Sequence, residues 1–417
     1  MFKREGEKAQ IIGTPELNCG PRQVTLAPIN TTLELDMVFG RRLVNLVSTF
    51  KENDNPDEGK LAKELEWFVV RHQNHLNVLG AYLLRGEDGV CGSAFFLLQN
   101  RPLLGYLGEF KLFSIPLRCV RFVEPPQFPD ESQAYGRILE SLKKMDSVDG
   151  LYLRSLRVNS SFWNYLTTDP ELGKEFLLYL PDKLSHHYLI NLPASFEEYL
   201  QKFSAKTRNN LRRSVRKLQK DSGAEVRLSR ITSPEQVDSF VDSAVEISKK
   251  TYQWRLLGSG LRSPETLKRN LRFLAELGWL RCYLLWCGKE ACAFMICHQR
   301  NGLCHSPTIG YDPQWESYSV GTILQFLVIE DLFTYDRPAI FDFGTGAGGQ
   351  KEFFGNAHYL DADIYLLRRG VYTYLACSVH RASNNVAMYT RRLFDSLHLK
   401  KPIKKFIRKV SVSSGKN

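Results

Sequence analysis

The sequence lacks any apolar run long enough to cross a membrane. No stretch reaches the roughly 18–20 apolar residues that a bilayer requires, and the first ten residues, MFKREGEKAQ, do not contain the hydrophobic core of a secretory signal. We therefore expect a cytoplasmic protein. The nine cysteines include no CxxC pair, so neither a zinc knuckle nor a disulfide framework is indicated.

Several catalytic signatures are also missing. There is no G-x-S-x-G elbow for a serine nucleophile, and the triplet Asp342-Phe343-Gly344 has no accompanying HRD loop of a kinase. The run DFGTGAG is similar to the ribose-binding motif of methyltransferases. However, only about 70 residues follow it, without the repeated strand–helix units that a doubly wound sheet needs.

The composition is that of a globular protein with more than one core. At 417 residues, with 43% apolar and 24% charged residues, the chain is expected to form two domains. The net charge of +11 and the pI near 9.1 are compatible with a polyanionic partner, but for net charge by itself we favour a well-solvated basic surface. Charge alone does not distinguish nucleic acid, phosphorylated sugars, coenzyme phosphates and an anionic membrane.

The two halves repeat one order of elements. The first half contains a hairpin pattern at 81–100, further strand-like material, a helix pattern at 134–145 and a strand pattern at 150–158. The second half contains the hairpin RCYLLWCGKEACAFMICHQ, then HSPTIGYD, the helix SVGTILQFLVIEDLF and the strand AIFDF. This order predicts two related domains with a boundary near residue 185.

Two basic segments stand out. In FSAKTRNNLRRSVRKLQK, Ser204 is a candidate helix cap, and Lys206 and Arg208 follow in the first turn, where cations oppose the helix dipole unless an anion binds nearby. The tail after residue 371 is rich in Lys and Arg and is interrupted by Pro402. We favour a solvated helical end for this tail, and contact with an anionic membrane is the alternative.

The stretch YDPQWESYSVGTILQF predicts a strand end, a loop and a helix N-terminus. Pro313 stops the strand, and the helix begins near Ser319 with free backbone N–H groups that suit a pyrophosphate. A simple cap at Ser319 is the alternative. Five cysteines at 282, 287, 292, 297 and 304, with His298 and His305, are interpreted as core residues, and we expect no metal site.

Taken in order, FSAKTRNNLRRSVRKL, the second hairpin, GYDPQWESYSVGTILQF and FDFGTGAGGQKEFFG resemble the FemAB-like branch of the GNAT acyltransferases. This branch includes cellulose- and exopolysaccharide-associated acetyltransferase-like proteins. The resemblance covers about residues 186–370. It implies two neighbouring strands that separate near Tyr311 and Phe343 to admit the donor, and a donor pyrophosphate at the start of the following helix. The usual Q/R-x-x-G-x-G/A coenzyme loop is absent there.

The resemblance also implies roles for individual residues. Lys351 would stabilise the oxyanion and Asp342 would take or orient the proton of the attacking amine, while a hydrogen bond to the glycine turn is the alternative for Asp342. Lys206 and Arg208 would contact acceptor phosphates. The donor site would comprise Tyr311, Ser319, Val320, Gly321, Thr322, Gly344 and Gly346.

The sequence therefore predicts an α+β protein of two tandem GNAT-like domains, each a mixed, mostly antiparallel twisted sheet flanked by helices. We expect a loose arm at 1–25, a degenerate domain at 26–185, a FemAB-like domain at 186–370 and a basic helical tail at 371–417. The expected function is N-acyl transfer from acyl-CoA, used as a co-substrate with no permanently bound cofactor, to an anionic sugar or cell-envelope precursor. The alternatives are transfer from aminoacyl-tRNA and a silent binding protein. We expect no DNA partner and a cytoplasmic location, with the tail as the candidate contact to the inner membrane face.

Overall fold

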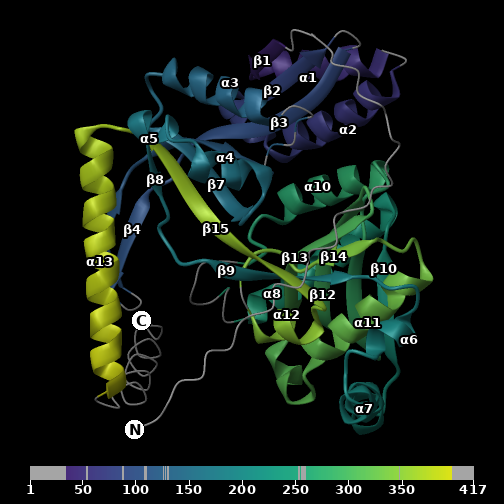
Figure 1. Cartoon of the computed structure of the whole chain (residues 1–417). Coiled ribbons are helices and arrows are strands. Elements are labelled where there is room, and N and C mark those ends of the chain that lie inside the picture. Colours follow the sequence, from purple (N-terminus) through teal and green to yellow (C-terminus); the bar gives the residue numbers. More distant parts are fainter. Residues whose placement is uncertain are drawn as a thin grey trace, which may run out of the picture.

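The computed structural model describes residues 34–396, apart from 53–54, 87–88, 108–109, 125, 127, 129–130, 252–253, 255–259 and 347. Within these residues the predicted α+β class is confirmed, and the strands of both halves join edge to edge in one 13-stranded sheet (Figure 1). The strand order is β1-β2-β3-β6-β7-β15-β9-β14-β13-β12-β11-β10, and β8 also pairs with β15. The predicted arm at 1–25 lies outside the described residues.

The N-terminal half contains the predicted hairpin, strand, helix and strand. Its elements are β1 (Glu34–Phe39), α1 (Arg41–Glu52), α2 (Pro56–Arg71), η1 (Gln73–Val78), β2 (Leu79–Gly86), β3 (Gly89–Asn100), β4 (Leu103–Leu107), β5 (Phe110–Ile115), β6 (Arg118–Phe122), α3 (Glu131–Lys143), β7 (Gly150–Arg157), α4 (Ser161–Thr168), α5 (Leu172–Glu175) and β8 (Phe176–Tyr179). Alternate residues of β2 face opposite cores: Leu83 packs with α1 and α2, and Leu84 packs with α3 and α4.

The C-terminal half repeats this arrangement. Its elements are β9 (Ser185–Asn191), α6 (Phe196–Leu200), α7 (Ala205–Ser222), β10 (Val226–Ile231), η2 (Pro234–Gln236), α8 (Val237–Lys250), α10 (Pro264–Glu276), β11 (Cys282–Cys287), β12 (Glu290–Arg300), β13 (Leu303–Tyr311), η3 (Pro313–Tyr318), α11 (Val320–Thr334), β14 (Ile340–Asp342), α12 (Gly349–Phe354), β15 (Ala357–Arg368) and α13 (Val371–Ser396).

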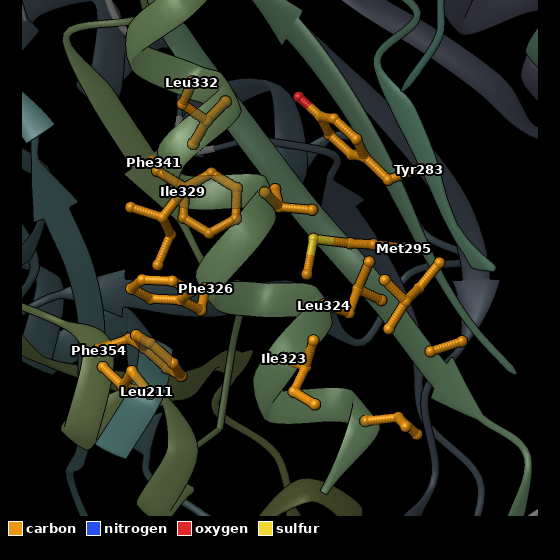
Figure 2. Packing of buried hydrophobic residues seen from close by; sticks show 14 of the residues in the cluster. Leu211, Tyr283, Met295, Ile323, Leu324, Phe326, Ile329, Leu332, Phe341 and Phe354 are labelled. Atoms are coloured by element: carbon orange, nitrogen blue, oxygen red, sulfur yellow. The ribbon is translucent and has the colours of Figure 1, made fainter. Parts of the chain in front are cut away.

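The helix α11 forms the centre of the C-terminal core. Most of its side chains are apolar and buried, and they do not gather on one face, which is typical of a helix at the centre of a core. Figure 2 shows Ile323, Leu324 and Phe326 among neighbours that include Met295 of β12 and Phe354 of α12. The five cysteines of the second hairpin region are buried, as the interpretation as core residues requires.

One strand, β15, crosses between the two halves at the middle of the sheet. The strand β9, the first of the C-terminal half, pairs with β14 of the same half. The strand β15 follows α12 but pairs with β7 of the N-terminal half. It also pairs with β9, from Ala357 opposite Leu189 to Asp361 opposite Ser185. The boundary near residue 185 stays a prediction, because β15 carries C-terminal sequence into the N-terminal part of the sheet.

The helix α13 lies along the outside of the molecule (Figure 1). It leaves large apolar side chains exposed, among them Val371 at 80% and Tyr374 at 66%. None of the described helices is both long enough and apolar enough to cross a membrane. The basic tail beyond residue 396 lies outside the described residues, so its predicted membrane contact stays a prediction.

Candidate active site

The strands β13 and β14 run parallel and then separate. They pair over three positions, and the last pair is His305 opposite Asp342. Beyond this pair β14 ends, while β13 continues to Tyr311. The chain leaves β14 through Gly344 and Gly346, whose φ angles of +74° and +92° favour glycine. The predicted separation of the strands near residues 311 and 343 therefore begins at His305 and Asp342.

Asp342 is the best connected polar group at this point. Its Oδ1 accepts hydrogen bonds of 2.7 Å from His187 Nε2 and 2.7 Å from the Gly344 N–H. Its Oδ2 lies 3.4 Å from His305 Nδ1. Burial would raise the pKa of Asp342, but hydrogen bonds from His187 and His305 outweigh it and hold the pKa well below the usual range. The hydrogen bond to the glycine turn, weighed from the sequence as an alternative role, is present.

His187 on β9 lies between two carboxylates. Its Nδ1 is 3.0 Å from Asp361 Oδ2 on β15, opposite the contact with Asp342, and its side chain is almost fully buried. Burial would lower the pKa of His187, but the hydrogen bonds with Asp342 and then Asp361 raise it to about 9. The imidazole is therefore charged at neutral pH, and its positive charge offsets part of the negative charge of the two carboxylates. Its ring also stacks on Tyr359 at 4.6 Å.

Sequence reasoning missed both histidines. His187 lies in SHHYLIN, where a polar residue at an inward position of an apolar strand was the available signal. His305 was grouped with the cysteines as a core residue, but its side chain is 31% exposed. The neighbouring His298 is more buried, and burial followed by the proximity of His305 lowers its pKa to about 3, so it is neutral.

Lys351 on α12 points back into the glycine loop. Its Nζ donates to the carbonyl oxygens of Gly344 at 3.0 Å and Thr345 at 2.7 Å. Burial lowers the pKa of Lys351, and the charges of Asp342 and Asp361 oppose this effect. An ammonium group has three N–H donors, so one remains for a ligand. The other end of α12 is held by Lys202, whose Nζ donates to the Phe353 carbonyl at 2.8 Å.

The predicted donor residues gather at the start of α11. Ser319 has a left-handed φ of 55° and makes no side-chain capping bond, contrary to the simple cap weighed from the sequence. A Cβ at Gly321 would lie 3.3 Å from the Tyr311 ring, so glycine lets this ring approach the start of the helix closely. Val320 is buried, and the Thr322 N–H is bonded to the Ser319 carbonyl at 2.8 Å. Gln350 donates to the Gly321 carbonyl at 3.1 Å and so joins α12 to this turn.

The predicted acceptor residues lie on a different element. Ser204 caps α7 by accepting from the Thr207 N–H at 3.2 Å. Lys206 is exposed, and Arg208 donates to the Phe203 carbonyl at 3.0 Å. Phe203 packs on Phe353 of α12 at 5.0 Å. The structure thus joins Asp342, Gly344, Lys351, Gly321 and Tyr311 through α12 and the glycine loop, whereas Lys206 and Arg208 adjoin only the far end of α12.

Comparisons with known proteins give a family match and a similar fold. Residues 205–359 match the family model described as acetyltransferase (GNAT) domain. No curated protein matches the sequence.

Among solved structures, the crystal structure of FemX is similar with a TM-score of 0.54 at 11% identity, covering 82% of this chain and all of FemX. A conserved protein of unknown function from Bacteroides thetaiotaomicron VPI-5482 has a TM-score of 0.48 at 10% identity, covering 80% of this chain and 99% of that one. L-PGS from Bacillus licheniformis has a TM-score of 0.47 at 11% identity, covering 84% and 96%. Residues 205–359 are therefore similar to a GNAT acetyltransferase domain, and the fold of the chain is similar to that of FemX over the full length of FemX.

Proposed function

We propose that the protein transfers an acyl group to an amine at the separation of β13 and β14. The observation that carries this proposal is the pair His305–Asp342 at the last rung of the parallel ladder, inside the segment that matches the GNAT model. A half-exposed imidazole backed by a buried carboxylate is a suitable proton acceptor for an attacking amine.

Each polar group has one task in this proposal. Asp342 holds the Nδ1–H of His305, which leaves Nε2 free to take the proton as the amine nitrogen bonds to the acyl carbon. The remaining N–H of Lys351 stabilises the oxyanion that forms on the acyl oxygen. When this intermediate collapses, the bond to the donor's sulfur or oxygen breaks and the leaving group takes the proton from His305. His187, charged and buried, keeps Asp342 ionised and in place.

For the donor we favour an aminoacyl ester carried on tRNA. The similarity to FemX extends over all of FemX, and proteins of that kind do not need the coenzyme loop that this sequence lacks. The 3-10 helix η3 directly precedes α11, and the Tyr311 ring lies against Gly321. The backbone N–H groups of Val320 and Gly321, in the first turn of α11, are the proposed hydrogen-bond donors to a phosphate of the acyl donor. The basic charge of the chain suits a polyanionic donor.

Acyl-CoA is the second candidate donor, because the family model that matches residues 205–359 is that of acetyltransferases. For either donor, we propose an amine on an anionic sugar or cell-envelope precursor as the acceptor. Lys206 and Arg208 remain proposed acceptor contacts.

The first test identifies the donor. The full-length protein is incubated with amino-sugar nucleotides and either charged tRNA or acetyl-CoA, and product is followed by mass spectrometry. Product that disappears after ribonuclease treatment supports the tRNA donor, and release of free thiol supports acyl-CoA.

Replacing Lys351 with Ala separates an enzyme from a silent binding protein. We expect turnover to fall by about 10²–10³-fold, since an oxyanion donor is lost, while binding of the substrates persists. Lys220→Ala, exposed in the last turn of α7, is the control. Absence of turnover with every donor, with ligand binding intact, would contradict the proposal.

A further inference from the structure

Three arginines gather around Tyr152 on the N-terminal part of the sheet. Arg121 of β6 lies opposite Tyr152 of β7, and Arg154 lies two residues further along β7 on the same face. The guanidinium of Arg101 lies over the Tyr152 ring, 4.4 Å from its centroid. Arg101, Arg121 and Arg154 are called the arginine cluster.

The arginine cluster has no carboxylate partner among the described residues. In contrast, two other partly buried arginines are paired with carboxylates: Arg230 with Asp331 at 2.7 Å, and Arg300 with Glu64 at 3.3 Å. The Nε atoms of Arg101 and Arg121 are buried and have no hydrogen-bond partner among the residues that the structure describes, and the same holds for Nε2 of Gln99 on the adjoining strand. Buried donors without partners are unfavourable unless a ligand satisfies them.

The arginines also repel one another. Burial lowers the pKa of Arg121, and the charges of Arg101 and Arg154 lower it further. Like charges held together in a partly buried place destabilise the protein, and an anion placed among them would remove this cost. Guanidinium groups bind carboxylates and phosphates through two parallel N–H bonds, and three guanidinium groups together suit the several oxygens of a phosphate.

The arginine cluster adjoins the candidate active site. The NH2 group of Arg154 donates to Thr345 Oγ1 of the glycine loop at 3.0 Å. The carbonyl oxygen of Thr345 in turn accepts from Lys351. The loop that contains Gly344 and Gly346 therefore contacts the arginine cluster through Arg154. The helix α12, which follows this loop, is joined to the start of α11 by Gln350.

We propose that Arg101, Arg121 and Arg154 bind a phosphate group of the acyl acceptor and present its amine to the glycine loop. The assignment to the acceptor rests on the proposed function, in which the start of α11 receives the donor. The anion site itself depends only on the arginines. This site lies on the N-terminal half and is distinct from Lys206 and Arg208.

Pyrophosphate is the probe for the experiment. Titration calorimetry on the full-length protein, without donor, compares wild type with Arg121→Gln, Arg101→Gln and the control Arg213→Gln on the exposed face of α7. We expect the affinity to fall by about ten-fold or more in each cluster variant, because a charge-assisted hydrogen bond is lost, and to stay unchanged in the control. Pyrophosphate should also raise the melting temperature of wild type but not of Arg121→Gln.

The outcomes separate the sources of the phosphate and the two proposals. Pyrophosphate that stays bound in saturating coenzyme A and in tRNA, but is displaced by a uridine diphosphate amino sugar, supports the acceptor site. Displacement by coenzyme A or tRNA would overturn the assignment to the acceptor. Unchanged affinity in both cluster variants would overturn the anion site, whether or not transfer activity is found. If pyrophosphate binding depends on the arginines but no donor supports transfer, the anion site stands, and both the proposed function and the assignment of the site to the acceptor are overturned.

Discussion

In each half of the molecule two parallel strands pair and then separate, but the polar side chains at the two points of separation differ in chemistry. In the C-terminal half, β13 and β14 pair over three positions that end at His305 opposite Asp342. In the N-terminal half, β6 and β7 also pair over three positions, ending at Arg121 opposite Tyr152. At each site the second residue bonds to a side chain of the neighbouring strand, Asp342 to His187 of β9 and Tyr152 to Asp363 of β15. One backbone arrangement thus holds two different polar sites.

The difference decides which site can accept a proton. Burial, and then Asp363, which accepts the Tyr152 O–H at 2.5 Å, raise the pKa of Tyr152 to about 12, so the phenol stays neutral. The C-terminal site offers a half-exposed imidazole and an ionised carboxylate instead. The comparison indicates that the C-terminal separation is suited to proton transfer and the N-terminal one to holding an anion.

The largest expected effect is on turnover in His305→Ala. Loss of a general base lowers kcat by about 10²–10⁴-fold, and the substrate affinities should change little. His186→Ala, on β9 next to His187 but exposed, is the matched control and should retain activity. Steady-state kinetics on both variants tests whether His305 is the general base. A normal kcat in His305→Ala would show that another residue is the base.

The next largest effect is on stability in His187→Gln. Removing the charge leaves Asp342 and Asp361 close together without their shared partner, and breaking a buried charged pair costs about 3–5 kcal/mol. Tyr152→Phe removes only one hydrogen bond at the equivalent place and should cost about 1 kcal/mol. Urea unfolding measures both. Equal losses in the two variants would show that the two sites contribute alike and would break the comparison.

A smaller effect is expected in the pH dependence of stability. The pKa of His187 is raised from 6.5 to about 9 on folding. Its contribution to the free energy of unfolding is therefore full below pH 6.5 and is lost as the pH rises through about 9. The difference in the free energy of unfolding between wild type and His187→Gln should shrink from pH 6 to pH 9.5. Urea unfolding midpoints over this pH range measure the change. A constant difference over this range would mean that His187 is not charged in the folded protein.

Much of the site could be inferred from local sequence. Gly344 and Gly346 were recognisable as turn residues, and both have positive φ. Lys351 was recognisable from its place after the loop, and its Nζ does return to the loop carbonyls. His187 was not recognisable, because its partners Asp342 and Asp361 lie 155 and 174 residues away in the chain. The arginine cluster was missed for the same reason, since Arg101, Arg121 and Arg154 come from separate segments.

The sequence by itself determined the repeated order of hairpin, strand, helix and strand, because alternation of apolar residues, glycine turns and helical periodicity act over a few neighbouring residues. Only the tertiary structure decided that β15 leaves the C-terminal half and pairs with β7 of the N-terminal half. Pairing between strands far apart in the chain depends on which edges remain open after each half has formed, and local patterns do not encode that choice. The pairing of β9 with β14 on one side and β15 on the other brings His187 between Asp342 and Asp361, and so creates the polar centre of the candidate site.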